Sequence, residues 1–275
     1  MQFKKNPAKS FRSPHGSRQS GPFKKRETTS WEGVGGWYQQ IVGESGHYYH
    51  QAVILPKLLK MLAVKPGHSL LDLACGQGVL ARALPDAVQY QGLDLAAGLI
   101  KMAKKQATSK QQEFAVQDIT QPFTLQKKDF DYAAIILALQ NLEQPLEALK
   151  NARRHLKEHG KLFIVLNHPC FRIPRQSSWQ IDEAKKVQYR RIDRYMSPMK
   201  IPIQTHPGKP SKETETWSFH YSLSNIAECL ASAGFLISSM QEWCSDKQST
   251  GKNAKMEDRA RDEIPLFLAI EAVAC

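Results

Sequence analysis

The stretch LLDLACGQGVLARAL, residues 70–84, decides how this sequence is interpreted. It begins as an apolar run of strand length, passes through a turn that contains Gly76 and Gly78, and continues with a helical pattern. Glycines in such a turn let the backbone approach a ligand closely, and the helix that follows offers unpaired N–H groups. The stretch therefore predicts a strand, a ligand-binding turn and a helix.

Strand-like and helix-like segments alternate on the C-terminal side of this stretch. The expected strands are 88–95, 112–119, 130–139 and 161–167, and the expected helices are 96–107 and 145–160, the second ending at Gly160. A further helix at 222–235, with Ser222 or Ser224 as its cap and Gly234 as its end, precedes a closing pair of strands at 236–243 and 264–273. Strands separated by helices predict an α/β fold with a parallel sheet and right-handed crossovers.

Two cofactors fit the glycine turn. Gly76-x-Gly78-x-x-Ala81 nearly matches the dinucleotide fingerprint G-x-G-x-x-G/A, and Asp94 lies at a suitable distance to bind ribose hydroxyls. However, Asp72 precedes Gly76 by four residues, and its carboxylate would repel a doubly anionic pyrophosphate. A carboxylate there suits the ammonium and sulfonium groups of S-adenosylmethionine instead.

LLDLACGQG resembles motif I, D-x-G-x-G-x-G, of class I S-adenosylmethionine-dependent methyltransferases, with Ala74 in place of the first glycine. Asp94, which ends YQGLDL, matches the acid that binds the ribose in this family, and Asp118 in FAVQDI matches the acid near the adenine amino group. FDYAAIILALQNL resembles motif IV, and EALKNARRHLKEHGKLFIVLN resembles the helix, turn and fifth strand that follow it. The resemblance covers about residues 66–167 and the final helix and strand pair.

The resemblance is greatest to the group that includes quinone-biosynthesis and other small-molecule methyltransferases. It implies a Rossmann-like three-layer sandwich: a mostly parallel seven-stranded sheet with an antiparallel last strand and an inserted lid after strand 5. It also implies that S-adenosylmethionine is the cofactor, held by the residues that match the motifs: Asp72, Ala74, Gly76, Gly78, Asp94 and Asp118.

The segment before motif I is rich in glycine and aromatic residues. Residues 1–30 are expected to be a disordered basic tail, and residues 31–65 an N-terminal helical cap on a methyltransferase domain that spans 31–275. Tyr38 is a candidate contact for the sulfonium, because aromatic faces attract cations, and His47 is a second candidate. The alternative is a helix that packs its aromatic side chains on the edge of the sheet.

Residues 167–220 interrupt the alternation and contain six prolines, so regular sheet is not expected there. Because this segment begins where the fifth strand ends, it should form a lid over the substrate. The substrate contacts expected from it are Arg172, Arg175 and Tyr195, the arginines binding an anionic group unless they merely form a solvated face. His168 is the first candidate for a general base, with His206 and His220 as alternatives to it, unless these are structural or surface histidines.

The formal net charge of +12 is unevenly distributed. Residues 1–26 carry eight basic residues and no acid, and residues 167–212 carry ten basic residues against three acids. The five cysteines show no CxxC pair and no metal-ligand spacing, so reduced thiols in the cytoplasm and no metal site are expected. No apolar run is long enough for a membrane span, and the N-terminus lacks the apolar core of a secretory signal.

These features predict a methyltransferase that acts on a small, anionic or aromatic molecule. One alternative is an RNA or other nucleic-acid methyltransferase that grips phosphates with the basic tail and lid. Another is a protein that binds S-adenosylmethionine without catalysis.

Overall fold

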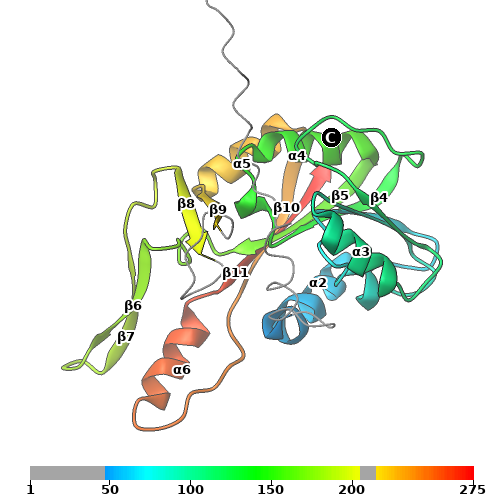
Figure 1. The fold of residues 1–275 in the computed structure, drawn as a ribbon. Coiled ribbons are helices and arrows are strands. Elements are labelled where there is room, and N and C mark those ends of the chain that lie inside the picture. Colours follow the sequence, from blue (N-terminus) through cyan, green and yellow to red (C-terminus); the bar gives the residue numbers. More distant parts are fainter. Residues whose placement is uncertain (1–46, 205–214) are drawn as a thin grey trace, which may run out of the picture.

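The computed structural model describes residues 47–204 and 215–275. At its centre lies a seven-stranded sheet with the strand order β10-β11-β5-β4-β1-β2-β3 (Figure 1). Its strands are β1 (Ser69–Leu73), β2 (Gln89–Asp94), β3 (Gln112–Val116), β4 (Phe130–Ile136), β5 (Leu156–Asn167), β10 (Phe235–Trp243) and β11 (Phe267–Ala274). β1 to β5 pair in parallel, whereas β11 runs antiparallel to both β5 and β10. The mostly parallel sheet with an antiparallel last strand confirms the fold expected from the sequence.

Helices cover both faces of this sheet, as alternation along the strands requires. The helices are η2 (His50–Ile54), α2 (Leu55–Leu62), α3 (Ala97–Lys105), α4 (Pro145–His155), α5 (Leu223–Ser232) and α6 (Ala254–Glu263), with short 3₁₀ turns η3 (Ala81–Ala83) and η4 (Leu139–Asn141). Leu71 packs in one core cluster together with residues of α4 and α5. Leu70, its neighbour in β1, packs in a second cluster with residues of α2 and α3. Because successive strand residues point to opposite faces, these two clusters form the interfaces of a three-layer sandwich.

Two helix boundaries differ from the sequence-based expectations. The glycine turn leads only into the short η3, because Leu84 is extended and precedes Pro85, which disfavours helical backbone in the residue before it. The helix expected to end at Gly160 ends at His155, since Leu156 pairs with Phe130 of β4 and is buried as the first residue of β5. Burial of Leu156 therefore overrides the helical propensity of residues 157–159.

The inserted segment forms two antiparallel hairpins, so the expectation that residues 167–220 lack regular sheet was wrong. β6 (Ser177–Asp182) pairs with β7 (Val187–Ile192), and β8 (Met199–Gln204) pairs with β9 (Glu215–His220). Pro202 lies inside β8, which tolerates it because β8 pairs only with β9 among the described strands and so has an edge position. In Figure 1 the β6–β7 hairpin extends away from the central sheet, and β7 contacts α6, a helix that the sequence analysis did not anticipate.

The N-terminal part of the described chain, which was expected to belong to a helical cap, packs its apolar side chains on the sheet. Val53, Ile54, Leu58 and Leu62 are all buried against the sheet. Residues 1–46, which contain Tyr38 and the expected basic tail, lie outside the described residues. No helix in the described parts of the chain is long and apolar enough to cross a membrane.

Candidate active site

The turn after β1 holds three residues in left-handed backbone conformations. Ala74, Gly76 and Gly78 have φ angles of 62°, 56° and 75°. A Cβ on Gly78 would lie 2.9 Å from the Phe114 ring, whereas a Cβ on Gly76 would meet no atom within 4 Å. Gly78 is therefore required by packing, and Gly76 leaves open space beside the backbone for a ligand. Ala74, which replaces the family's glycine, adopts the same type of conformation despite its side chain.

Asp94 at the end of β2 joins this turn to the next loop. Its Oδ2 accepts a hydrogen bond of 2.8 Å from the Gly76 N–H, and its Oδ1 accepts one of 2.9 Å from the Ala96 N–H. The carboxyl ends of β1 and β2 lie side by side because the two strands pair in parallel. The structure thus brings Gly76 and Asp94 into direct contact, as a shared cofactor site requires.

Asp72 lies in β1 just before the turn and is almost completely buried, with 2% of its surface exposed. The Tyr90 hydroxyl donates a hydrogen bond of 2.6 Å to its Oδ2, while its Oδ1 is buried with no hydrogen-bond partner. Burial raises the pKa of Asp72 to about 7, against the opposing effect of the Tyr90 hydrogen bond. A buried carboxylate with one unsatisfied oxygen beside a glycine turn fits a cationic ligand group, such as the ammonium of S-adenosylmethionine.

Asp118 follows β3 at the same edge of the sheet. Its Oδ1 accepts hydrogen bonds from the backbone N–H of Thr120 at 2.9 Å and from the Thr120 hydroxyl at 2.6 Å. The N–H of the preceding residue, Gln117, donates to the Asp94 carbonyl, which ties the two loops together. Asp118 is therefore placed beside the Asp94 loop, and its contact with an adenine stays a prediction.

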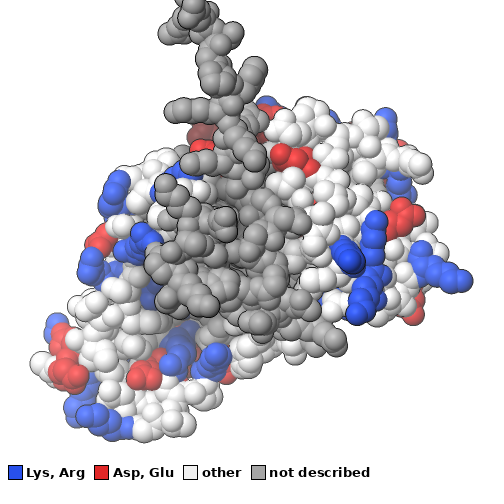
Figure 2. Space-filling view, in the orientation of Figure 1, with Lys and Arg blue, Asp and Glu red and all other residues white. Residues whose placement is uncertain are grey.

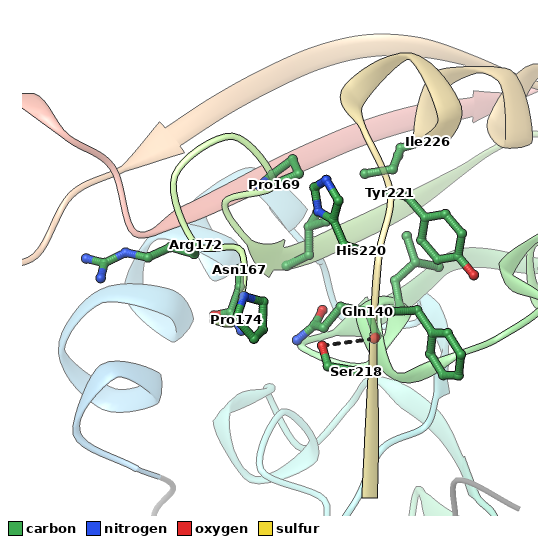
Figure 3. Close-up of a pocket in the computed structure, with 12 residues that line it drawn as sticks. Gln140, Asn167, Pro169, Arg172, Pro174, Ser218, His220, Tyr221 and Ile226 are labelled. Carbon is green, nitrogen blue, oxygen red and sulfur yellow. Dashed lines mark hydrogen bonds between the residues drawn. The ribbon is translucent and has the colours of Figure 1, made fainter. Parts of the chain in front are cut away.

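A cavity lies beyond the carboxyl ends of β4 and β5, between the sheet and the inserted segment (Figure 3). It takes in about 430 Å³ of space, part of which is open to solvent. Its lining residues come from η4, the end of β5, the loop after β5, β9 and α5: Leu139, Gln140, Leu166, Asn167, Pro169, Arg172, Pro174, Ser218, Phe219, His220, Tyr221 and Ile226. The inserted segment thus supplies about half of the wall, as expected of a lid.

Two hydrogen-bond acceptors belong to the cavity lining. His220 Nε2 lies 2.6 Å from the Tyr195 carbonyl oxygen, so this nitrogen carries the proton and Nδ1 has a free lone pair in the neutral ring. Gln140 donates its amide to the Leu137 carbonyl, while its own Oε1 is buried without a partner. The cavity is therefore suited to a ligand that carries an O–H or N–H group. Gln140 follows the fourth strand in LALQNL, a position that the sequence analysis could have singled out.

His168, the first candidate for a general base, does not line this cavity. Only 1% of it is exposed, and its Nε2 lies 2.7 Å from Glu242 Oε1 in β10. Its Nδ1 accepts a hydrogen bond of 3.2 Å from the Cys170 N–H, so Nε2 is the nitrogen that donates to Glu242. With both ring nitrogens engaged, His168 anchors the start of the inserted segment to β10. Its role as a base stays a prediction that this arrangement does not favour.

The three expected substrate contacts occupy different positions. Arg172 lines the cavity, while its guanidinium in Figure 3 extends away from Gln140 and Ser218. Arg175 is exposed and is not part of the lining. Tyr195 stands behind the cavity wall, since its carbonyl accepts from His220 and its hydroxyl accepts from the Leu223 N–H at 3.0 Å. His206 lies outside the described residues.

Known proteins resemble this chain in sequence and fold. Residues 71–164 match the family model described as a methyltransferase domain. Among solved structures, an S-adenosylmethionine-dependent methyltransferase from Mesorhizobium loti aligns with a TM-score of 0.62 and 24% identity, covering 79% of this chain and 96% of that one. Another, from Clostridium acetobutylicum, aligns with a TM-score of 0.55 and 16% identity, covering 88% of this chain and 97% of that one.

Curated relatives match over a shorter stretch. A demethylmenaquinone methyltransferase from Lysinibacillus sphaericus is 29% identical over 106 residues, which cover 37% of this chain and 45% of the relative. A protein of the same name from Staphylococcus aureus is 27% identical over 108 residues, covering 38% of this chain and 45% of the relative. The chain thus spans less than half the length of these relatives.

The sheet topology and the glycine turn define a class I S-adenosylmethionine-dependent methyltransferase fold. Within it, residues 71–164 are the part that matches the methyltransferase-domain family model. The resemblance found in the sequence is thereby confirmed, and S-adenosylmethionine is the cofactor of this class.

Proposed function

We propose that this protein transfers the methyl group of S-adenosylmethionine to a small acceptor molecule bound in the cavity beneath the inserted segment. The main support is the position of that cavity. It lies at the carboxyl ends of β4 and β5, and β4 pairs directly with β1, which leads into the glycine turn. A cofactor cradle and an acceptor cavity at one edge of a parallel sheet suit the transfer of a group between two ligands.

The residues of the turn would hold the cofactor. Asp72 offers its unsatisfied oxygen to a cationic group, Gly76 offers open backbone, and Asp94 offers its carboxylate to the ribose hydroxyls. Bound S-adenosylmethionine supplies a methyl group on a positively charged sulfur. Asp118 and Tyr38 remain proposed contacts by analogy with the family.

His220 is the residue that we propose to take the acceptor's proton. The Tyr195 carbonyl fixes the proton of the neutral ring on Nε2, which leaves Nδ1 able to accept one. Gln140 Oε1 would accept a hydrogen bond from the same acceptor group and orient it. This assignment replaces His168 with one of the alternative candidates from the sequence, because His168 has no nitrogen available.

The acceptor is proposed to be a small aromatic or anionic molecule. The relatives named demethylmenaquinone methyltransferases support an aromatic acceptor, and the apolar side chains in the cavity lining, such as Leu139 and Ile226, are compatible with one. The alternative, a nucleic-acid acceptor, relies on the basic residues of the tail, which lie outside the described residues. On the face in Figure 2, the described residues carry basic side chains interspersed with acidic and uncharged ones.

Cofactor binding is the first experiment. Calorimetry with S-adenosylmethionine should show that Asp94→Ala binds about 10–150-fold more weakly than the wild type, since charge-assisted hydrogen bonds contribute roughly 1.5–3 kcal/mol. Asp86→Asn, an exposed carboxylate outside the site, is the matched control and should bind like the wild type. Equal affinities in Asp94→Ala and wild type would remove Asp94 from the site.

The acceptor is then sought with labelled S-adenosylmethionine in metabolite and RNA extracts. Label in a small molecule, retained after deletion of residues 1–26, supports the proposal. Label in RNA that disappears with the deletion and weakens steeply with salt would support the nucleic-acid alternative instead. A protein that binds the cofactor but labels neither extract would point to the non-catalytic alternative.

A further inference from the structure

Two arginines share one tryptophan beside the cavity. Arg172 belongs to the loop after β5, and its guanidinium carbon lies 5.7 Å from the ring centroid of Trp179 in β6. Arg190 in β7 lies directly opposite Trp179 in the hairpin, with its guanidinium carbon 5.2 Å from the same ring. We refer to Arg172 and Arg190 as the arginine pair.

The arginine pair has no acidic partner among the residues that the structure describes. Arg190 donates to the Phe171 carbonyl and the Ser177 hydroxyl, both at 2.8 Å. Arg172 makes no side-chain hydrogen bond within the described residues, and its Nε is buried without a partner. By contrast, two neighbouring carboxylates of the hairpin pair with exposed residues: Asp193 with Arg191, and Asp182 with Lys185.

This arrangement is electrostatically unfavourable as it stands. Burial and, to a smaller extent, the positive charge of Arg190 lower the pKa of Arg172 to about 10. Both arginines are partly buried, and charges that are partly withdrawn from water without an acidic partner destabilise a fold, as do like charges close together. An anion bound at these guanidinium groups would offset both penalties, because each group offers N–H donors in the planar geometry that carboxylates and phosphates accept.

We infer that the arginine pair binds a carboxylate or phosphate group of the methyl acceptor. The inference rests on the proposed function in that Arg172 also lines the acceptor cavity. Because the Arg172 guanidinium points away from Gln140 and Ser218, the anionic group lies at the opposite end of the acceptor from the group that meets those residues (Figure 3). The acceptor is therefore a molecule with an anion at one end and an O–H or N–H group at the other.

Trp179 holds the two arginines in this arrangement. A cation over the face of an indole is attracted to it, and here one ring is shared by two cations. Stacking accounts for the position of both side chains, but it satisfies none of the N–H donors of Arg172. An anion would satisfy the buried Arg172 Nε, which has no partner among the described residues, whereas stacking on Trp179 does not.

The test uses three probes of similar size: benzoate, phenyl phosphate and the neutral benzamide. Calorimetry or ligand-observed NMR on the full-length wild type should show tighter binding of at least one anion than of benzamide. Arg172→Gln and Arg190→Gln should each weaken that anion about 10-fold or more, and leave benzamide unchanged. Lys186→Gln removes an exposed charge from the turn of the same hairpin and should change neither affinity. The better-bound anion identifies which group the acceptor carries.

Two results would overturn the inference. One is a wild type that binds neither anion better than benzamide up to the millimolar range; the other is a set of arginine variants that bind the anions as the wild type does. S-adenosylmethionine binding, measured on the same samples, reports whether the variants fold. The same measurement separates the two proposals. A wild type that does not bind S-adenosylmethionine would contradict the methyltransferase proposal, whereas the anion measurements would still test the arginine pair.

Discussion

The glycine turn after β1 and the inserted segment after β5 flank the same edge of the sheet, but they are built differently. In the turn, backbone groups define the geometry. Asp94 accepts hydrogen bonds from two backbone N–H groups, and Gly78 is required because the Phe114 ring leaves no room for a Cβ. In the inserted segment, side chains define the cavity, with His220 oriented by a carbonyl and Arg172 oriented by an indole ring. The fold itself supplies the first site, whereas residues added to the fold supply the second.

This difference predicts that the two regions can be altered independently. A change in the turn should alter the affinity for S-adenosylmethionine or the stability of the sheet. A change in the inserted segment should alter turnover and acceptor binding while cofactor affinity stays constant. Each of the following variants changes one of the two regions and tests whether the other is unaffected.

The largest effect is expected for His220→Gln. A glutamine amide can still donate to the Tyr195 carbonyl, but it has no basic nitrogen in place of Nδ1. Turnover with the acceptor found in the extract screen should fall by about 10²–10⁴-fold, the usual contribution of a general base. Calorimetry should give the same affinity for S-adenosylmethionine as the wild type.

His168→Gln provides the comparison for this variant. It also retains a donor for Glu242, so the start of the inserted segment should stay anchored to β10. A larger loss of turnover in His168→Gln than in His220→Gln would restore His168 as the base. A loss of cofactor affinity in His220→Gln would show that the two regions are not independent.

The glycine turn and the inserted segment also differ in how much of each the sequence predicts. The strands and the turn could be read directly, because apolar runs, glycines and acids such as Asp94 occur at fixed positions along the chain. The choice between His168 and His220 could not, because it depends on partners far away in the sequence: Glu242 for one and the Tyr195 carbonyl for the other. The arginine pair likewise depends on hairpin register, which places Arg190 opposite Trp179.

The hairpins themselves were missed for a related reason. Proline density argues against sheet only where both edges of a strand need hydrogen bonds, and β8 pairs with one strand, β9, in the part of the chain that the structure describes. In the same way, buried Leu156 begins a strand where the local pattern favours a continuing helix. In both cases tertiary contacts outweighed the local signal.

A moderate effect on stability is expected for Gly78→Ala. A left-handed conformation disfavours any side chain, and the new Cβ would lie 2.9 Å from Phe114, so the ring must move. Overpacking of this kind destabilises by about 1–3 kcal/mol beyond the backbone penalty. Gly76→Ala is the matched control: its φ is also positive, but its Cβ meets no atom, so only the backbone penalty of roughly 1–2 kcal/mol applies. Urea unfolding without cofactor measures the free energy of unfolding of both variants. Equal destabilisation would show that the Phe114 ring moves aside at no cost.

A change of stability with an unexpected sign is predicted for Asp72→Asn. The pKa of Asp72 is raised to about 7 in the folded state, so the folded state holds a proton that the unfolded chain has already released. The stability that this proton provides is fully present at acid pH and is lost as pH rises from about 4 to about 7. Asparagine carries no charge to bury, so the variant should lack this decline and be more stable than the wild type above pH 7 in thermal unfolding without cofactor.

Binding should change in the opposite direction. A cationic group beside the carboxylate favours its ionised form, so wild-type affinity for S-adenosylmethionine should increase as pH rises through about 7, and Asp72→Asn should lose both that increase and part of the affinity. Asp131 in β4 is the contrasting case: partial burial raises its pKa, but hydrogen bonds with Lys157 and Ser69 together outweigh this and lower the pKa to about 2. Asp131→Asn should therefore destabilise the protein near neutral pH. If Asp72→Asn were also destabilising at pH 8, the buried carboxylate would be part of the structural framework of the sheet rather than a group maintained for its ligand.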